Sequence, residues 1–108
     1  MEIIGYRTRN LEQACSSERA AKRLFGDQVA RKIKLRVKDV ESADLAPDLF
    51  LGPGKWHALQ HEGLAGCLAG SLTANWRFIV RPDGWDAEVG WSGVSAVEIW
   101  DICDYHGR

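Results

Sequence analysis

The spacing of apolar residues changes near the middle of the chain, and this change restricts the fold more than any other feature of the sequence. Four β-branched residues recur at spacings of four, four and three, which puts them on one face of a helix. They are Val29, Ile33, Val37 and Val40. From Lys55 onward, short β-branched and aromatic runs are bounded by Gly, Pro, Asn and Asp, as strands and turns are. Helices followed by strands indicate an α+β domain.

The first part of the chain predicts one strand and two antiparallel helices. Glu2–Tyr6 is β-branched enough to be a strand, and a helix is expected to begin near Arg9, where Asn10 resembles the start of a capping box. Gly26 is positioned to end the first helical run, and Asp27 to cap the helix that carries the apolar face.

The second part predicts strands joined by turns. Strands are expected at residues 56–60, 67–73, 76–81 and 95–105, with a hairpin at residues 85–93. Together the two parts predict an α+β fold in which two N-terminal helices pack on one face of a mainly antiparallel sheet of about four or five strands.

The length of 108 residues fits a single domain, which we expect to span residues 1–108. No apolar run approaches the roughly 20 residues that span a bilayer, and no basic segment precedes an apolar one at the N-terminus. We therefore expect a cytoplasmic protein without a membrane partner.

The three cysteines, Cys15, Cys67 and Cys103, are odd in number and widely separated, so no disulfide framework is predicted. A metal site would also need histidines, but no two cysteines have the spacing of a zinc site, and His57 and His61 share no clear helix. We predict no metal site.

Charge is distributed unevenly along the chain. Residues 1–38 hold ten Lys and Arg against four Asp and Glu, whereas residues 39–108 hold four bases against eleven acids. The asymmetry indicates a polyanionic partner for the basic part or a basic partner for the acidic part, unless both are simply solvated surfaces.

The end of the chain carries an acid, a phenol and an imidazole in a row. Asp104, Tyr105 and His106 each need a hydrogen-bond partner or solvent, which makes this tail a candidate site. In a regular strand Asp104 shares a face with Trp100 and Ile102, as does His106. Tyr105 points to the other face, so the three side chains meet only if the strand end bends or bulges.

Four segments together resemble the RelE/ParE toxin superfamily, and its HigB-like killer proteins in particular. They are Pro-Gly-Lys-Trp-His-Ala-Leu at 53–59, Leu-Ala-Gly at 64–66, Asn-Trp-Arg-Phe at 75–78 and Asp-Tyr-His at 104–106. The Phe-Gly turn at 25–26 fits the same layout, so the resemblance covers nearly the whole chain. It rests on the order and spacing of these segments rather than on any one of them, and it implies a RelE-like fold.

This resemblance implies the toxin of a type II toxin–antitoxin system, a metal-independent endoribonuclease that cleaves mRNA in the translating ribosome and so inhibits translation. The implied partners are the ribosome, mRNA and a small helix-turn-helix antitoxin, through which alone the toxin would meet DNA. No cofactor is implied. In such chemistry the ribose 2′-hydroxyl attacks the adjacent phosphate, so the site needs proton-transfer groups and a fixed cation.

The resemblance also assigns candidate catalytic residues. Arg77 matches the family's strand arginine, whose planar fork suits phosphate oxygens. His57 matches the histidine after the Pro-Gly turn, and imidazole titrates near neutral pH. In the terminal triplet an acid–base role falls to Asp104 or His106, and Tyr105 would stack on the substrate or hydrogen-bond to it.

One position departs from the family. Members commonly carry a lysine three residues after the histidine, but this chain has Gln60, followed by His61. A neutral amide cannot replace a phosphate-binding cation, whereas a protonated His61 partly can. Because the later part of the chain is acidic, RNA binding is also expected to use Arg31, Lys34 and Lys38.

Two other interpretations follow from the same residues. One is a non-catalytic or degenerate protein of this fold that poisons DNA gyrase or only binds the antitoxin, which Gln60 and the acidic part of the chain favour. The other is a small sheet domain without a toxin role, in which Arg77 simply pairs with Glu98 or Asp101.

Overall fold

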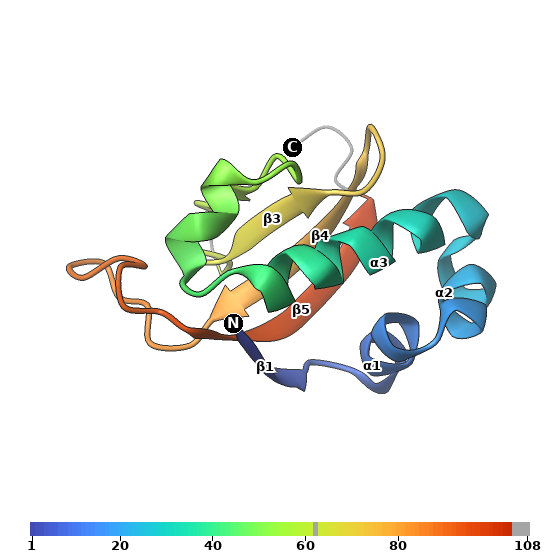
Figure 1. The fold of residues 1–108 in the computed structure, drawn as a ribbon, viewed down its shortest axis with the longest axis horizontal. Helices are drawn as coiled ribbons and strands as arrows, with labels where there is room; N and C mark the ends of the chain where they lie inside the picture. Colours follow the sequence, from blue (N-terminus) through green and yellow to red (C-terminus); the bar gives the residue numbers. More distant parts are fainter. Residues whose placement is uncertain (62, 105–108) are drawn as a thin grey trace.

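The computed structural model describes residues 1–61 and 63–104. The chain forms a five-stranded sheet with α-helices on one side (Figure 1). In chain order the elements are β1 (Glu2–Tyr6), α1 (Arg9–Ser16), α2 (Glu18–Phe25), α3 (Asp27–Ser42), the 3-10 helix η1 (Ala46–Leu51), β2 (His57–Ala58), β3 (Leu68–Ser71), β4 (Trp76–Pro82) and β5 (Ala96–Asp104). The strand order is β1-β5-β4-β3-β2, with β1 parallel to β5 and the other neighbours antiparallel. The predicted α+β fold with a mainly antiparallel sheet is confirmed.

The helical region holds three α-helices in the described part of the chain, where the sequence predicted two. Helix α1 begins at Arg9 as expected, but its cap is Thr8 rather than Asn10, because Thr8 Oγ1 accepts the Leu11 amide at 3.2 Å. Ser17 then ends α1 and caps α2. Serine is common at this position because its hydroxyl accepts a hydrogen bond from a backbone amide in the first turn of the next helix. The single helix that the sequence predicted before Gly26 is therefore divided into α1 and α2.

Gly26 separates α2 from α3 and has a φ of 85°. Glycine adopts this left-handed conformation without steric cost, which is why the chain turns here. Asp27 is the first residue of α3 and makes no capping hydrogen bond, so the expectation that it caps this helix is wrong. Its carboxylate still lies in the first turn, where it complements the helix dipole.

The strands differ from the prediction mainly at one edge of the sheet. β2 contains only His57–Ala58, because only these residues pair with β3. The hairpin expected at residues 85–93 is instead a loop with one isolated bridge between Asp86 and Gly90. This loop projects from the left of the molecule in Figure 1.

The main core lies between α3 and the sheet (Figure 1). Val29, Ile33 and Val40 of α3 are buried there, as their spacing predicted, and they share a cluster with fully buried Phe78 of β4. A smaller cluster lies on the opposite face of the sheet and contains Leu59, Cys67, Ala69 and Ile79. We call that opposite face, turned away from α1–α3, the distal face.

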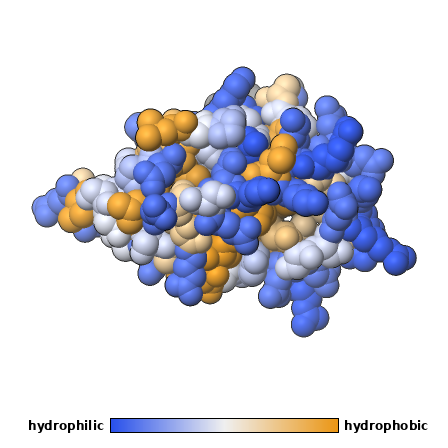
Figure 2. Space-filling view, viewed as in Figure 1, coloured by the Kyte–Doolittle hydropathy of each residue, from blue (hydrophilic) through white to orange (hydrophobic). Residues whose placement is uncertain are grey.

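The surface over the helices is mostly hydrophilic (Figure 2). An apolar patch at the upper left of this view overlies η1, where the residues Phe50 and Leu51 are 42% and 89% exposed. Among residues 1–61 and 63–104, none of the helices combines the length and the apolar character that a membrane span requires.

Candidate functional site

His57 and Arg77 lie on the distal face. The register pairs His57 with Ala69 of β3, Ala69 with Ile79 of β4, and Ile79 with Asp101 of β5, so these four residues share one face. Arg77 is two residues from Ile79 on the same strand and therefore points to the same side. Two strand spacings, about 10 Å, separate the strands that carry His57 and Arg77.

The turn before β4 fixes the guanidinium of Arg77. Nη1 donates to the carbonyl oxygens of Thr73 at 2.9 Å, Trp76 at 3.0 Å and Ala74 at 3.3 Å. The Nε atom is buried and has no hydrogen-bond partner in the described part of the chain. Leaving a buried donor unpaired costs about 1–3 kcal/mol, so an anion that accepted from Nε would bind favourably.

The pairing of Arg77 with an acid, which the sequence left open, is not found among the described residues. Asp101 instead forms an ion pair with Arg7, whose Nη2 lies 3.5 Å from Asp101 Oδ1. Arg7 also donates from Nε to the Trp100 carbonyl at 2.6 Å. Its guanidinium and that of Arg81 both lie against the Trp100 ring, with Cζ atoms 5.3 Å and 4.2 Å from the ring centre. Arg7 and Arg81 are thus basic residues beside the distal face that sequence reasoning missed.

His57 is exposed, and its Nδ1 lies 3.3 Å from the carbonyl oxygen of Lys55. His61 is also exposed and belongs to the loop between β2 and β3, where its carbonyl accepts the Leu64 amide at 2.9 Å. Gln60 lies exposed between them. The distal face therefore carries His57 at its β2 edge.

A bulge in β5 changes which of its residues share a face. Ile79 is opposite Asp101, but the next residue of β4 is opposite Ile99, so Trp100 is the extra residue. Consequently Trp100 packs with the distal cluster, whereas Ile102 belongs to the main core. The regular alternation expected for this strand, which put Trp100 and Ile102 together, is therefore wrong.

Asp104 is the last residue of β5 and is exposed. It is paired in register with Trp76. The ring of Trp76 packs edge-on against the ring of Phe25 of α2, with the two ring centres 5.9 Å apart. Asp104 thus points to the helix-covered face, away from Arg77, which is opposite Cys103. Tyr105 and His106 lie outside the described residues, so the structure relates only Asp104 of the triplet to the other candidates.

Helix α3 carries basic residues on two opposite sides. The residues predicted to bind RNA are all exposed: Arg31, Lys34 and Lys38. Lys34 and Lys38 line a groove between α3 and the first two helices. Lys32 and Arg36 lie about half a helical turn away and face a different pocket, which Arg77 also lines.

This second pocket, which we call the cationic pocket, has a volume of about 500 Å³. It lies where α3, the loop before β2 and the turn between β3 and β4 meet. Among the described residues that line it, the ionisable ones are all cations: Lys32, Arg36, Lys55 and Arg77. The remaining lining residues are Pro53, Ser71, Leu72, Thr73 and Ala74. Sequence reasoning found only Arg77, although the spacing of four between Lys32 and Arg36 was a signal that they share a helix face.

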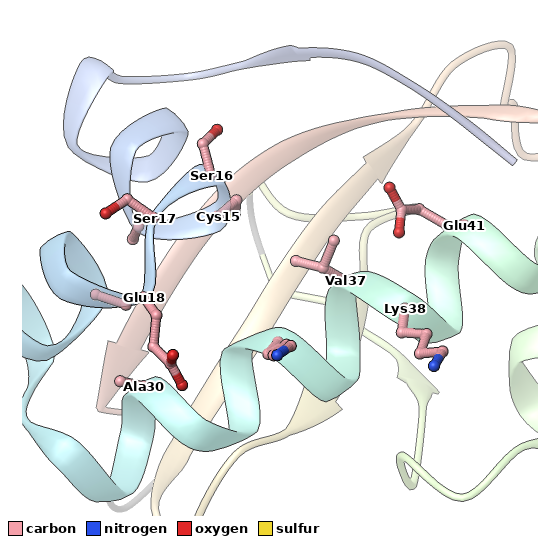
Figure 3. A pocket seen from close by; sticks show the side chains of 11 residues that line it. Cys15, Ser16, Ser17, Glu18, Ala30, Val37, Lys38 and Glu41 are labelled. Atoms are coloured by element: carbon pink, nitrogen blue, oxygen red, sulfur yellow. The ribbon is translucent and has the colours of Figure 1, made fainter.

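The groove beside Lys34 and Lys38 has a volume of about 450 Å³ and a different character. Figure 3 shows Val37 projecting from α3 toward Cys15 at the end of α1, and Lys38 also lines the groove. Glu18 and Glu41 also line it, so its charges are mixed. The groove therefore lacks the purely cationic lining of the cationic pocket.

Burial raises the pKa of the Cys15 thiol from 9.0 to about 12. Because the unfolded chain ionises this thiol more easily, its contribution to stability is complete below pH 9.0 and is lost as the pH rises toward 12. Between about pH 8 and about pH 10.5, the free energy of unfolding should fall by about 1–2 kcal/mol more in the wild type than in Cys15→Ala. Urea unfolding at both pH values measures the difference, and equal losses would contradict the prediction.

No group of three or more His, Cys, Asp or Glu side chains within residues 1–61 and 63–104 is arranged to hold a metal ion. Cys15 and Cys67 are free thiols.

The fold is similar to a solved structure, the YoeB/ParE toxin from Agrobacterium tumefaciens. The TM-score is 0.59, the match covers 96% of this chain and 98% of that chain, and 20% of the residues are identical. The chain has the fold of a YoeB/ParE toxin. No family model matches the sequence, and neither does any curated protein. The YoeB/ParE likeness concerns the fold, so the chemistry must be argued from the residues themselves.

Proposed function

We propose that this protein is the toxin of a type II toxin–antitoxin system and a metal-independent, ribosome-dependent mRNA endoribonuclease of the HigB-like kind. In this proposal it acts in the cytoplasm, inhibits translation and is neutralised by a small helix-turn-helix antitoxin, which provides its only link to DNA. The YoeB/ParE fold over nearly the whole chain supports the proposal.

The observation that carries the proposal is the fixed guanidinium of Arg77 on the same sheet face as His57. Three backbone carbonyls hold Nη1, while the buried Nε has no partner among the described residues. A preorganised cation stabilises the charge that develops on a phosphate during attack by the 2′-hydroxyl, because it needs no reorganisation as the charge forms. Arg77 is therefore the proposed phosphate-stabilising residue.

Proton transfer is proposed for His57 and for the terminal triplet. His57 is exposed on the distal face, so it is accessible to a nucleotide. His106 is the proposed second acid–base group, because Asp104 points to the helix-covered face, away from Arg77, and Tyr105 would contact a base of the substrate. The 2′-hydroxyl loses its proton to one group, and the departing 5′-oxygen takes a proton from the other.

RNA contacts outside the reacting phosphate are proposed for exposed basic residues on two elements. Arg31, Lys34 and Lys38 lie on α3, and His61 lies in the loop after β2. The charges of Arg31, Lys34 and Lys38 offset the acidic composition of the later part of the chain. Arg81 stacks on Trp100 and adds a cation beside the distal face.

A second candidate function is a non-catalytic protein of the same fold, which binds an antitoxin or poisons gyrase. The pairing of Asp104 with Trp76, on the face opposite Arg77, favours it, as does the neutral Gln60. A binder needs neither a proton-transfer pair nor a fixed phosphate-binding cation.

The nuclease proposal is tested with purified protein added to ribosomes that translate a defined mRNA. We expect new mRNA 5′ ends, mapped by primer extension, and no cleavage of the same mRNA without ribosomes. Arg77→Ala should slow cleavage by at least about 100-fold, because it removes the cation that stabilises the transition state. His57→Ala should slow it by about 100-fold or more.

Arg19→Ala is the matched control, because Arg19 is an exposed arginine of α2. This variant should cleave at the wild-type rate. Arrest of translation without new 5′ ends, unchanged by Arg77→Ala, would contradict the nuclease and favour the binder. Inhibition of purified gyrase would then identify which kind of binder it is.

A further inference from the structure

Three of the four cations in the cationic pocket have no anionic partner in the described part of the chain. Arg36 forms an ion pair with Asp39, but Lys32, Lys55 and Arg77 form none. None of the acidic residues within 1–61 and 63–104 lines the pocket. Three uncompensated cations around one cavity of about 500 Å³ repel one another unless an anion lies between them.

Arg36 forms a rigid wall of this pocket. It is only 8% exposed, its Nη1 donates to the Ser71 carbonyl at 3.3 Å, and its Nε lies 3.2 Å from Asp39 Oδ2. Asp39 Oδ2 in turn accepts from Trp56 Nε1 at 3.0 Å. These contacts tie α3 to β3 and to the loop before β2, so Arg36 acts as a positioning residue.

Lys55 has an unusual backbone conformation. Its φ of 53° makes it the one non-glycine residue with a positive φ in residues 1–61 and 63–104. The preceding Gly54 is held by its carbonyl, which accepts the Ser71 amide at 2.8 Å. Strained residues such as Lys55 persist where the surrounding structure holds them, and they cluster at functional sites. Here the strain turns the chain so that Lys55 lines the pocket.

Arg77 adds a donor that lacks an acceptor. Its Nη1 is occupied by the turn carbonyls, whereas its buried Nε is without a partner among the described residues. The edge of a guanidinium formed by Nε and Nη2 is one that binds phosphate oxygens in a bidentate manner. A buried donor of this kind calls for an acceptor, which residues 1–61 and 63–104 do not supply.

We propose that the cationic pocket is a phosphate-binding subsite for the RNA backbone, contacted by Lys32, Lys55 and Arg77 and positioned by Arg36. A phosphodiester supplies one negative charge and two oxygens that accept hydrogen bonds, which suits the donors of this pocket. The subsite extends the RNA path from the distal face, through Arg77, to the side of α3 opposite Lys34 and Lys38. The inference rests on the proposed function only for the choice of RNA as the source of the phosphate.

The test uses a fluorescent oligoribonucleotide of about eight nucleotides with 2′-O-methyl groups, which cannot be cleaved because it has no 2′-hydroxyl. Anisotropy at several salt concentrations should give about fivefold weaker binding for Lys32→Ala and for Lys55→Asn. Each variant should also lower the slope of log affinity against log salt by about 0.7, the value for one contact with a single strand. Asn is chosen because it tolerates a positive φ better than most residues.

Lys22→Ala, at an exposed lysine of α2, is the matched control and should bind like the wild type. Lys55→Arg keeps the charge and should restore binding. In amide NMR spectra, inorganic phosphate should shift Ser71 and Thr73 in the wild type but not in Lys55→Asn. Equal weakening by Lys22→Ala would overturn the subsite in favour of general electrostatic attraction. Tighter binding of polyglutamate than of RNA at the same amides would overturn it in favour of an acidic protein partner.

The two proposals fail in different ways. If the pocket variants lose affinity for the oligonucleotide while the wild type cleaves no mRNA on ribosomes, the subsite stands and the nuclease does not. If mRNA is cleaved but Lys32→Ala and Lys55→Asn bind like the wild type, the nuclease stands and the subsite does not.

Discussion

Gly66→Ala is expected to lower the free energy of unfolding by about 3 kcal/mol, whereas Gly63→Ala should lower it by only about 1 kcal/mol. Both glycines lie in the loop between β2 and β3 and have positive φ angles, of 89° and 80°. A Cβ at Gly66 would lie 2.5 Å from Cδ2 and Cε3 of Trp85, but a Cβ at Gly63 would meet nothing within 4 Å. The two variants therefore share the backbone strain and differ in the steric clash.

Urea unfolding of the two variants and the wild type measures this difference. The clash involves Trp85, whose ring centre lies 6.0 Å from the ring centre of Trp91. Trp91 Nε1 in turn donates a hydrogen bond to the Gly66 carbonyl at 2.9 Å. Combining Gly66→Ala with Trp85→Ala should therefore cost less than the sum of the single changes, because the smaller side chain relieves the clash. Equal losses for Gly66→Ala and Gly63→Ala would contradict the proposed close packing.

The fold could be predicted because its signals are local. The spacing of Val29, Ile33 and Val40 gave the buried face of α3 directly, and the strands from residue 67 onward follow short apolar runs. The misassigned caps have a simple origin. Asn10, Asp27 and Ser17 are all good capping residues, and only the observed hydrogen bonds show that Ser17 is the one used.

The site was harder to predict because it depends on register and on loop paths. Because of the bulge at Trp100, the residues that follow it point to the opposite sheet face from the one that regular alternation predicts. Tryptophan is not a residue type that predicts a bulge. Lys55 reaches the cationic pocket only because Gly54 passes beside β3, which is a contact between distant segments. Sequence periodicity carries no information on such contacts.

The uneven charge of the linear sequence was a poor guide for the same reason. The boundary at residue 38 divides the cationic pocket, with Lys32 and Arg36 before it and Lys55 and Arg77 after it. Folding thus brings two of the four bases of the acidic part next to bases of α3. A net charge counted along a segment does not describe the potential at a site that several segments build.

Asp39 stabilises the buried charge beside this pocket. Its Oδ2 accepts from Trp56 Nε1 at 3.0 Å and lies 3.2 Å from Nε of Arg36, close enough for an ion pair although not aligned as a hydrogen bond. The space around them is filled, because a Cβ at Gly54 would lie 2.5 Å from Trp56 Nε1 and 2.6 Å from Asp39 Oδ2. Arg36 therefore has no room to move toward Gly54 if Asp39 is removed.

Asp39→Ala is accordingly expected to lower the free energy of unfolding by about 3–5 kcal/mol, because it leaves the charge of Arg36 buried without its partner. The double variant Arg36→Met with Asp39→Ala should lose less than Asp39→Ala alone, since it removes the unpaired charge and keeps an apolar side chain of similar length. Urea unfolding of both single variants and the double variant completes the thermodynamic cycle. A loss below about 1 kcal/mol for Asp39→Ala would mean that solvent reaches Arg36, and the wall of the cationic pocket would then be less rigid than these contacts indicate.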